Sequence, residues 1–581
     1  MKKNILLLLI TFSFAVYCDA QVAKSNDVIV TWGDNIKGTE NSRICNLYVN
    51  SKGNLISLRA WKSKFTVLQY GHSNLAVAKT ASFDFKPLEK KTGHNIYSDD
   101  CVFFNDKVCV FIMEKDSEKE KFYFKVATID TKTMLVRDVV QISEMKFLGN
   151  NSLEKLIISV SPDQSKLAIA HFQKGKNKDD LNLLIKTFDR NFRELMSRQL
   201  DDVGSHFIYG DRAVRYLGGQ VNQFTLTNYW YKWGNSYIDG AGDFSYAGKA
   251  SVNKISLKKI EKTSEMLLVD NTGKVFFPVL TETEGDLKRR NGEVLQNKRF
   301  FNSFDFHMFS PDQENYEVKK VKLSDKVIDL QDYKFQLAKN GDIIGGGFFC
   351  NELTKGINGT WFLRIDANSL EIKQNTADVY DLKFITQFLS ESKQQKVMKR
   401  YNNKKHVTLS SRFTVDDFIE TDDGEVRMVA EIYNIKTKTG STRAATTEYI
   451  YGDILVMNHD GRGDVTWKTT IRKLHKSVND FGYWNSYGVI AADDKLYFMY
   501  TDNEDNFTET KPDKVHNSNG KKGTFVYVTV DTHGKQKKER LYVIKDVATF
   551  TLPHFAAIKE SDLYLYAEKG NVYNVVKFSC E

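Results

Sequence analysis

The sequence predicts an all-β fold, a single β-propeller of eight or alternatively seven four-stranded blades, and two recurring patterns predict it. The first is a polar turn that runs directly into an alternating apolar strand, as in SPDQSKLAIA from Ser161. The second is a β-rich run that reaches an aspartate, turns and leaves as another strand, as in FKVATIDTKTML around Asp130. Together they give a four-stranded antiparallel unit, which buries both faces by stacking on further units around an axis.

The number of blades follows from how often these patterns occur. Aspartate suits the second turn because its short carboxylate accepts hydrogen bonds from backbone N–H groups of its own turn. The second pattern is centred on Asp130, Asp189, Asp366, Asp460 and Asp531. The first pattern lies near residues 53, 106, 164, 273, 341, 424, 494 and 562, which favours eight blades, with seven as the next choice.

The N-terminal residues 1–20 are typical of a secretory signal peptide. Two lysines precede an apolar run from Ile5 to Val16, which is too short to cross about 30 Å of hydrocarbon. Cleavage after Ala20 leaves a mature chain of residues 21–581, a single propeller domain, exported to the periplasm, the cell surface or the medium. A lipoprotein alternative at Cys18 is disfavoured because the bulky Tyr17 precedes it.

Two segments interrupt the repeat. Residues 379–400 place Leu382, Ile385 and Leu389 at helical spacing, which predicts a helix inserted between blades. Residues 204–249 are rich in Gly, Tyr and Trp and form a longer insertion. No later segment has the length of uninterrupted apolar sequence that an integral membrane span needs.

Charge and cysteine spacing exclude several classes of protein. The formal charge of +9 is spread over a chain rich in both signs, whereas nucleic-acid-binding proteins cluster basic residues on one face. The mature chain has Cys45, Cys101, Cys109, Cys350 and Cys580, none at the spacing of a zinc site or a redox motif. Export permits a disulfide between Cys101 and Cys109, and the odd count leaves at least one free thiol. We expect no metal and no cofactor.

One stretch resembles known proteins. The run GDILVMNHDGRGDVTWKTTIRK from Gly452, followed by YWNSYGVIAADDKLYFMYTDNEDN from Tyr483, looks like the C-terminal half of uncharacterised secreted proteins of Gram-negative bacteria. The segment from Asp460 to Trp467 is also similar to the Asp-Gly turn and strand Trp of quinoprotein-type and WD40-type propeller repeats. The resemblance implies a propeller and export, and it carries over no catalytic residue.

Three short motifs match functional signatures but fit the repeat better. Ser390 to Lys393 matches an S-x-x-K nucleophile motif, but the rest of that fold does not fit in the interval. Asp502 begins like a calcium loop, yet Phe507 stands where its sharp turn requires Gly, so we expect a hairpin tip. The Arg-Gly-Asp tripeptide from Arg462 is explained by turn chemistry.

Aromatic residues give the candidate binding site. Trp and Tyr rings beside Asn, Asp and Gly are typical of surfaces that bind sugars or peptides, since ring faces stack on C–H faces while amides bond hydroxyls. The alternative is that these rings fill gaps between blades. The candidate ligand-binding residues are Tyr229, Trp230, Trp233 and Tyr237, with Trp484 and Tyr487 in the echo YWNSYG.

These observations favour an exported, non-catalytic binding or scaffold module for a glycan, a peptide or an envelope protein. Two alternatives remain open: a carbohydrate-active or peptide-cleaving propeller enzyme, and a structural component of a cell-envelope complex. Paired-carboxylate hydrolysis needs two acids across a pocket, and the sequence carries no motif that identifies such a pair.

The chain ends predict how the ring closes. The last unit offers three strands and stops, while NDVIVTWGD opens the mature chain with a strand, Val28 to Trp32, that has no hairpin partner. An unpaired edge is avoided if the N-terminal strand joins the last blade. We therefore expect Val28 to Trp32 to pair with Val572 to Phe578.

Overall fold

The fold is described by a computed structural model. The structure describes most of the chain in segments, which are separated by short gaps and by one long gap between Asp201 and Leu267. The described residues are 22–25, 27–38, 42–72, 74–137, 139–147, 156–174, 181–201, 267–288, 291–351, 356–409, 413–438, 446–480, 482–511, 513–518 and 521–580.

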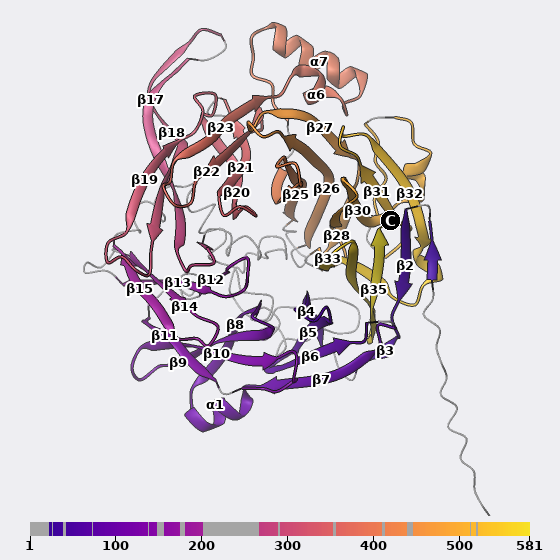
Figure 1. The fold of residues 1–581 in the computed structure, drawn as a ribbon. Helices are drawn as coiled ribbons and strands as arrows, with labels where there is room; N and C mark the ends of the chain where they lie inside the picture. Colours follow the sequence, from indigo (N-terminus) through magenta and orange to yellow (C-terminus); the bar gives the residue numbers. More distant parts are fainter. Residues whose placement is uncertain are drawn as a thin grey trace, which may run out of the picture.

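The described strands form eight antiparallel blades around one axis, as the sequence predicts (Figure 1). In blades 1 to 3, for example, the first strand lies nearest the axis, and the last lies at the perimeter. Blade 1 has β4 Arg43–Val49, β5 Leu55–Trp61, β6 Lys64–Tyr70 and β7 Val77–Asp84; blade 2 has β8 Asn95–Phe104, β9 Lys107–Asp116, β10 Lys121–Asp130 and β11 Val140–Lys146; blade 3 has β12 Ile157–Val160, β13 Leu167–Lys174, β14 Leu181–Phe188 and β15 Glu194–Leu200; blade 4 has β16 Leu268–Val269, β17 Val275–Lys288, β18 Val294–Phe309 and β19 Glu317–Lys322.

The second half of the ring repeats the same order. A single parallel bridge, Phe301 to Asp329, links the sheets of blades 4 and 5. Blade 5 has β20 Asp329–Leu337, β21 Ile343–Cys350, β22 Gly359–Ile365 and β23 Ile372–Val379; blade 6 has β24 Phe413–Glu420, β25 Val426–Lys438, β26 Thr446–His459 and β27 Val465–Ile471, with β28 His475–Val478 also on β26; blade 7 has β29 Gly488–Ala492, β30 Lys495–Asp502, β31 Thr524–Val530 and β32 Gln536–Val543; blade 8 has β33 Phe550–Lys559, β34 Asp562–Lys569 and β35 Val572–Cys580.

The N-terminal strand completes blade 8, and this confirms the predicted closure. Strand β2, Val28–Trp32, pairs antiparallel with β35, from Val28 opposite Cys580 to Trp32 opposite Val576. The β35 residues that pair with β2, Val576–Cys580, lie nearer the C-terminus than the expected range Val572 to Phe578. The reason is that β3 Ile36–Lys37 pairs with the start of β35. Strand β1 Val22–Lys24 pairs antiparallel with the outer edge of β2. The two ends of the chain therefore hold the ring closed.

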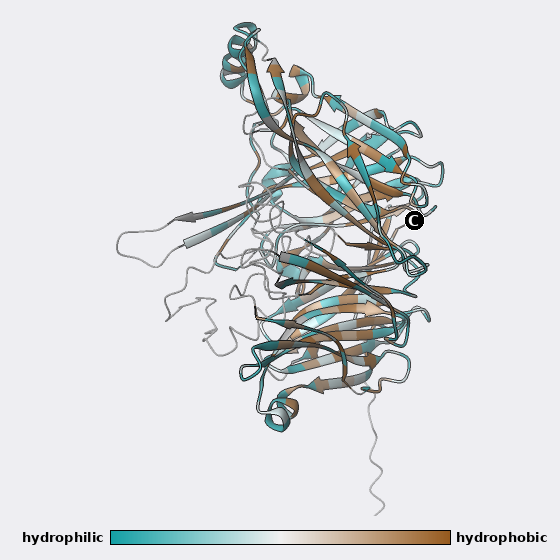
Figure 2. Ribbon diagram, turned by 90° about the vertical axis from the view of Figure 1, so that its left-hand side faces the viewer, coloured by the Kyte–Doolittle hydropathy of each residue, from teal (hydrophilic) through white to brown (hydrophobic). Residues whose placement is uncertain are grey.

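The apolar core is divided among the blade interfaces. Eight clusters of buried side chains occur in the described chain, one between each pair of neighbouring blades. Because both faces of a blade are covered, strands such as β21 and β31 are buried at every position. Figure 2 shows this distribution edge-on, with hydrophobic residues in the strands and hydrophilic residues at turns and helices.

The recurring turn between first and second strands has a backbone reason. All eight turns place at least one residue in the left-handed region, which costs about 1–2 kcal/mol for residues other than Gly. Gly avoids that cost and Asp tolerates the conformation, whereas Gln164 and Glu560 have neither advantage. The eight residues and their φ angles are Gly53 (76°), Asp106 (56°), Gln164 (55°), Gly273 (96°), Gly341 (88°), Gly424 (87°), Asp494 (60°) and Glu560 (54°).

The predicted aspartate turns join third and fourth strands. Asp531 is representative: its Oδ1 accepts the backbone N–H groups of His533 and Lys535, each at 2.9 Å. The corresponding carboxylates of Asp130, Asp189, Asp366 and Asp460 likewise each accept two backbone N–H groups.

The predicted inserted helix is present between blades 5 and 6, but as two helices. The Asp381 side chain accepts the Phe384 N–H at 2.6 Å and starts α6 Leu382–Thr386. The chain then turns through Leu389, and α7 Glu391–Asn402 starts after Ser390. The described residues also form α1 Lys86–Thr92 and the 3₁₀ turns η3 Glu504–Phe507 and η4 Ile544–Asp546. None of the helices in the described ranges is long and apolar enough to cross a membrane.

Candidate functional site

A pocket of about 440 Å³ lies at the axis, where the inner strands of four blades end. It is built by the last residues of β4, β8, β12 and β33 and by the turn that follows β12. It therefore opens on the face that carries the turns between first and second strands. The lining residues are Asn46, Leu47, Tyr48, Val49, Cys101, Val102, Phe103, Val160, Ser161, Pro162, Gln164, Ala557 and Ile558. We refer to this site as the axial pocket.

Two side-chain amides offer hydrogen bonds in the axial pocket. The Ser161 hydroxyl is used by its own turn, where it donates to Asp163 Oδ1 at 2.8 Å and accepts the Lys166 N–H at 2.9 Å. The Asn46 Oδ1 accepts the Leu47 N–H at 2.8 Å, which leaves its NH₂ group. The Gln164 side chain makes no hydrogen bond within the described part of the chain. Its amide is held in the pocket by a left-handed backbone.

Aromatic and aliphatic groups supply the rest of the pocket surface. The Tyr48 and Phe103 rings, from blades 1 and 2, stack with centroids 5.0 Å apart and planes at 22°. The Tyr48 hydroxyl donates to the Cys101 carbonyl at 3.4 Å. Burial raises the pKa of Tyr48 well above its ordinary value, so the ring remains a neutral phenol. Ile558, at the end of β33, is 53% exposed and adds an accessible aliphatic surface to the pocket.

Charged side chains are missing from this lining. Among the described residues that line the axial pocket there is no carboxylate, imidazole, ammonium or guanidinium group. The carboxylates of inner strands β20 and β24 instead bind protein groups. Asp332 Oδ2 accepts the Val415 N–H at 2.7 Å, and Asp416 Oδ2 accepts the Tyr487 hydroxyl at 2.6 Å. These acids therefore join blades 5 and 6 and the segment after β28.

The aromatic site residues predicted from sequence lie partly in the described chain. Trp484 is 9% exposed and packs edge-on against Tyr483 and Phe550, and Lys521 Nζ lies 4.9 Å above its ring. Tyr487 is 8% exposed. Both rings fill gaps between blades, the alternative weighed from the sequence, and a role in ligand binding stays a prediction. The remaining candidates, Tyr229, Trp230, Trp233 and Tyr237, lie outside the described residues.

The segment that carries Trp484 is anchored by a buried ion pair. Lys473 Nζ lies 2.5 Å from Glu431 Oε1, and neither side chain has exposed surface. The Ser486 hydroxyl donates to Glu431 Oε2 at 2.9 Å. Next to this pair, His475 Nε2 lies 2.5 Å from the Thr501 carbonyl, and burial lowers the pKa of His475 to about 3. This polar cluster is closed to solvent and positions the connection between blades 6 and 7.

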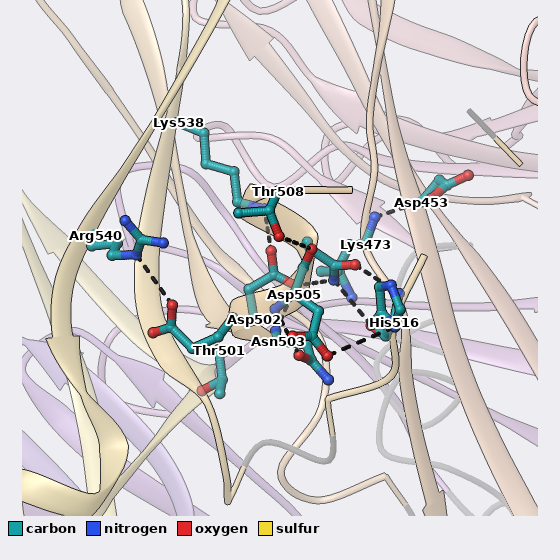
Figure 3. A network of polar contacts seen from close by, with 12 residues as sticks. Asp453, Lys473, Thr501, Asp502, Asn503, Asp505, Thr508, His516, Lys538 and Arg540 are labelled. Carbon is teal, nitrogen blue, oxygen red and sulfur yellow. Dashed lines mark hydrogen bonds and ion pairs between the residues drawn. The ribbon is translucent and has the colours of Figure 1, made fainter. Parts of the chain in front are cut away.

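Protein groups hold the loop that begins at Asp502 (Figure 3). The sequence predicts this loop to be a hairpin tip rather than a calcium site. Asp502 is fully buried and forms an ion pair with Lys538. It also accepts the Asn506 side-chain N–H at 2.7 Å, and Asn503 caps η3. Within the described ranges, no group of three or more His, Cys, Asp or Glu side chains could hold a metal ion.

The sequence did not single out the axial pocket residues. Asn46 and Tyr48 lie on β4 of blade 1 and Gln164 follows β12 of blade 3, so no local spacing joins the two sets. One signal was available: Gln164 occupies the turn position that Gly takes in four of the eight blades. A second hollow, about 640 Å³, lies along the exposed surface of α7.

Comparison with known proteins finds distant structural similarity but no matching family. No model of a protein family matches the chain, and no curated protein matches its sequence. Similar solved structures include the polysaccharide lyase Uly1, with 10% identity over 94% of this chain and 99% of that chain and a TM-score of 0.36. Porphyromonas gingivalis dipeptidyl peptidase 4 matches with 10% identity over 91% of this chain and 65% of that chain, at a TM-score of 0.34. The WD40 domain of SCAP from fission yeast has 8% identity over 96% and 94% of the two chains and a TM-score of 0.27. Scores this low carry no argument about activity.

Proposed function

We propose that this chain is an exported, non-catalytic β-propeller that binds an uncharged glycan segment in the axial pocket. The observation that carries the proposal is the composition of the pocket lining: stacked aromatic rings, aliphatic groups and two side-chain amides, with no charged group among the described residues. Its volume of about 440 Å³ lies within the usual range of small-molecule sites, roughly 300–1,000 Å³.

The lining matches the chemistry of a neutral sugar. The C–H face of a sugar ring packs on aromatic and aliphatic groups such as Tyr48 and Ile558, while its hydroxyls bond side-chain amides. The Asn46 and Gln164 amides can each donate and accept such bonds. An acidic or basic ligand would lose hydration here without an opposite charge to compensate it. The pocket therefore favours a neutral ligand over a charged one.

A binding role is favoured over catalysis by the ionisation of the two reactive groups in the pocket. Hydrolysis needs a base or a nucleophile in its ionised form. The Tyr48 pKa is raised by burial, and the Cys101 pKa is raised by a hydrogen bond with Cys45 and by burial. Both groups stay protonated near neutral pH. No observation favours the enzyme or the envelope-complex alternative over binding.

Paired substitutions at two equivalent turns test the proposal. Gln164→Gly removes the pocket amide and Glu560→Gly is the matched control, because both residues have the same left-handed backbone and only Gln164 lines the pocket. Binding is screened on an array of neutral and acidic oligosaccharides, and the affinity for the best neutral hit is measured by calorimetry. Loss of one hydrogen bond should weaken binding about threefold to tenfold in Gln164→Gly alone. Equal effects in the two variants, or hits confined to acidic oligosaccharides, would contradict the proposal.

Export is the second part of the proposal. A charged N-terminus, a short apolar run and a small residue at Ala20 support cleavage before Gln21. Intact mass and N-terminal sequencing of the protein from its native host should give a chain that starts at Gln21. Retention of residues 1–20, or a lipid on Cys18, would refute this step.

A further inference from the structure

Two cysteines lie at the interface of blades 1 and 2, next to the axial pocket. Cys45 is on inner strand β4 of blade 1, and Cys101 is on inner strand β8 of blade 2. Both belong to the cluster that fills the interface between these blades, where Cys45 is 7% exposed and Cys101 is half-buried. Cys101 also lines the axial pocket.

The backbone brings the two thiols together. The register of β4 against β5 shifts between Ile44 and Asn46, so Cys45 is the extra residue of a β-bulge. Bulges redirect the side chain that they carry. Cys45 and Cys101 meet in one cluster from neighbouring inner strands, and the Tyr48 hydroxyl donates to the Cys101 carbonyl at 3.4 Å.

No other pair of the five described cysteines has this arrangement. Cys101 lies opposite Val110, and Cys109 lies opposite Val102, so the two side chains point to opposite faces of blade 2. This alternation rules out the Cys101–Cys109 bridge that the sequence permits. Cys350, in blade 5, contacts Asn358 Oδ1 at 3.1 Å and His406 Nε2 at 3.5 Å. Cys580 belongs to the interface of blades 7 and 8.

We propose that Cys45 and Cys101 form a disulfide that links the inner strands of blades 1 and 2. The co-reactant is a disulfide oxidant, either a thiol–disulfide oxidoreductase or glutathione disulfide. One cysteine thiolate attacks the oxidant disulfide, forms a mixed disulfide and releases one oxidant sulfur as a thiolate. The other cysteine thiolate attacks the cysteine sulfur of that mixed disulfide, forms the Cys45–Cys101 bond and releases the second oxidant sulfur. The chain loses two protons and two electrons, and the oxidant disulfide becomes two thiols.

The surroundings indicate when this bond forms. Thiolates are the reactive species, and the hydrogen bond with Cys45 together with burial raises the pKa of Cys101 well above its ordinary value. Oxidation of the folded chain is therefore slow, and the bond forms while blades 1 and 2 assemble. Once formed, it is partly shielded from reductants, because Cys45 is buried and Cys101 is half-buried. The bond fixes two strands of the pocket wall. It also links blade 1, which follows the N-terminal closing strand in the chain, to blade 2.

Peptide mapping of the full mature chain tests the proposal. The chain is refolded with a mixture of reduced and oxidised glutathione, alkylated with N-ethylmaleimide in denaturant without reductant, and digested. The expected result is one linked peptide pair, which contains Cys45 and Cys101, with Cys109, Cys350 and Cys580 alkylated. Alkylation of all five cysteines, or any other linked pair, overturns the proposal.

Substitutions give a second readout. Cys45→Ala and Cys101→Ala should each abolish the linked pair and lower the apparent melting temperature of the oxidised protein by about 3 °C. Cys109→Ala is the control, because its linked pair should persist. If the alanine variants fail to fold, the wild-type peptide map still decides. The outcome does not depend on whether the axial pocket binds a glycan.

Discussion

Removing buried methyl groups from the N-terminal strand should loosen blade 8 selectively. Val28 and Val30 of β2 have no exposed surface and pack in the cluster between blades 7 and 8. The double variant Val28→Ala/Val30→Ala keeps the backbone of β2 and removes this packing. Thr31→Ala, a half-buried position on the other face of the same strand, is the matched control.

The size of the effect follows from the buried groups that are lost. Each Val→Ala change removes two methyl groups, worth about 0.8 kcal/mol each before the cost of the cavity. The pair should therefore weaken the attachment of β2 by about 3–5 kcal/mol. Because each 1.4 kcal/mol is about a factor of ten, local opening of β2 from β35 should become about 10²–10⁴ times more frequent.

Hydrogen exchange measured by mass spectrometry reports this opening directly. Peptides that cover Val576–Cys580, the β35 residues paired with β2, should exchange faster in the double variant, while blades 3 to 6 keep their protection. Thr31→Ala should leave β35 nearly unchanged. Unaltered exchange in β35, or faster exchange confined to β4–β7 of blade 1, would show that β2 does not close the ring.

Two other predictions concern stability. Lys473→Met leaves the buried Glu431 carboxylate without its partner and should cost about 3–5 kcal/mol, measured by denaturant unfolding, whereas Lys476→Met, a half-buried control, should cost far less. The free energy of unfolding should also fall as the pH drops from about 6.5 toward 4. Three buried histidines stay neutral in the folded chain over this range, whereas the same histidines bind protons in the unfolded chain. The loss should reach up to about 4 kcal/mol per pH unit. Burial lowers the pKa of His171 and His459 to about 4 and that of His475 to about 3. Chemical denaturation across this range should show a shallower slope for His171→Gln, and an unchanged stability from pH 6.5 to 4 would contradict the assignment.

The repeat and the ring closure could be predicted from sequence because both depend on local chemistry. A left-handed turn residue recurs in every blade, and Gly or Asp marks it in six of the eight. The closure followed from counting strands at the two ends of the chain. The inserted helix was also predictable, although the break at Leu389 was not. The extended backbone of Ser390 interrupts one periodic segment, and the Ser390 side chain makes no capping hydrogen bond.

The axial pocket could not be predicted, because it depends on how blades meet. Asn46, Tyr48 and Gln164 come from two different blades and share a surface only after the ring closes. Trp484, by contrast, was singled out from the sequence, but its environment could not be predicted. A tryptophan beside Asn and Ser is equally compatible with a sugar-binding surface and with a core, and the structure buries it between blades.

Footprinting of the bound complex tests the proposed site most directly. The mature chain is labelled by hydroxyl radicals with and without the neutral oligosaccharide that binds most tightly on the array. Protection should fall on the pocket segments Asn46–Val49, Val160–Gln164 and Ala557–Ile558, and should weaken in Gln164→Gly at equal ligand concentration. Protection of residues 479–487 or of the segment 228–237, with the pocket segments labelled as in the free protein, would contradict the axial site and return the aromatic segments as the binding surface.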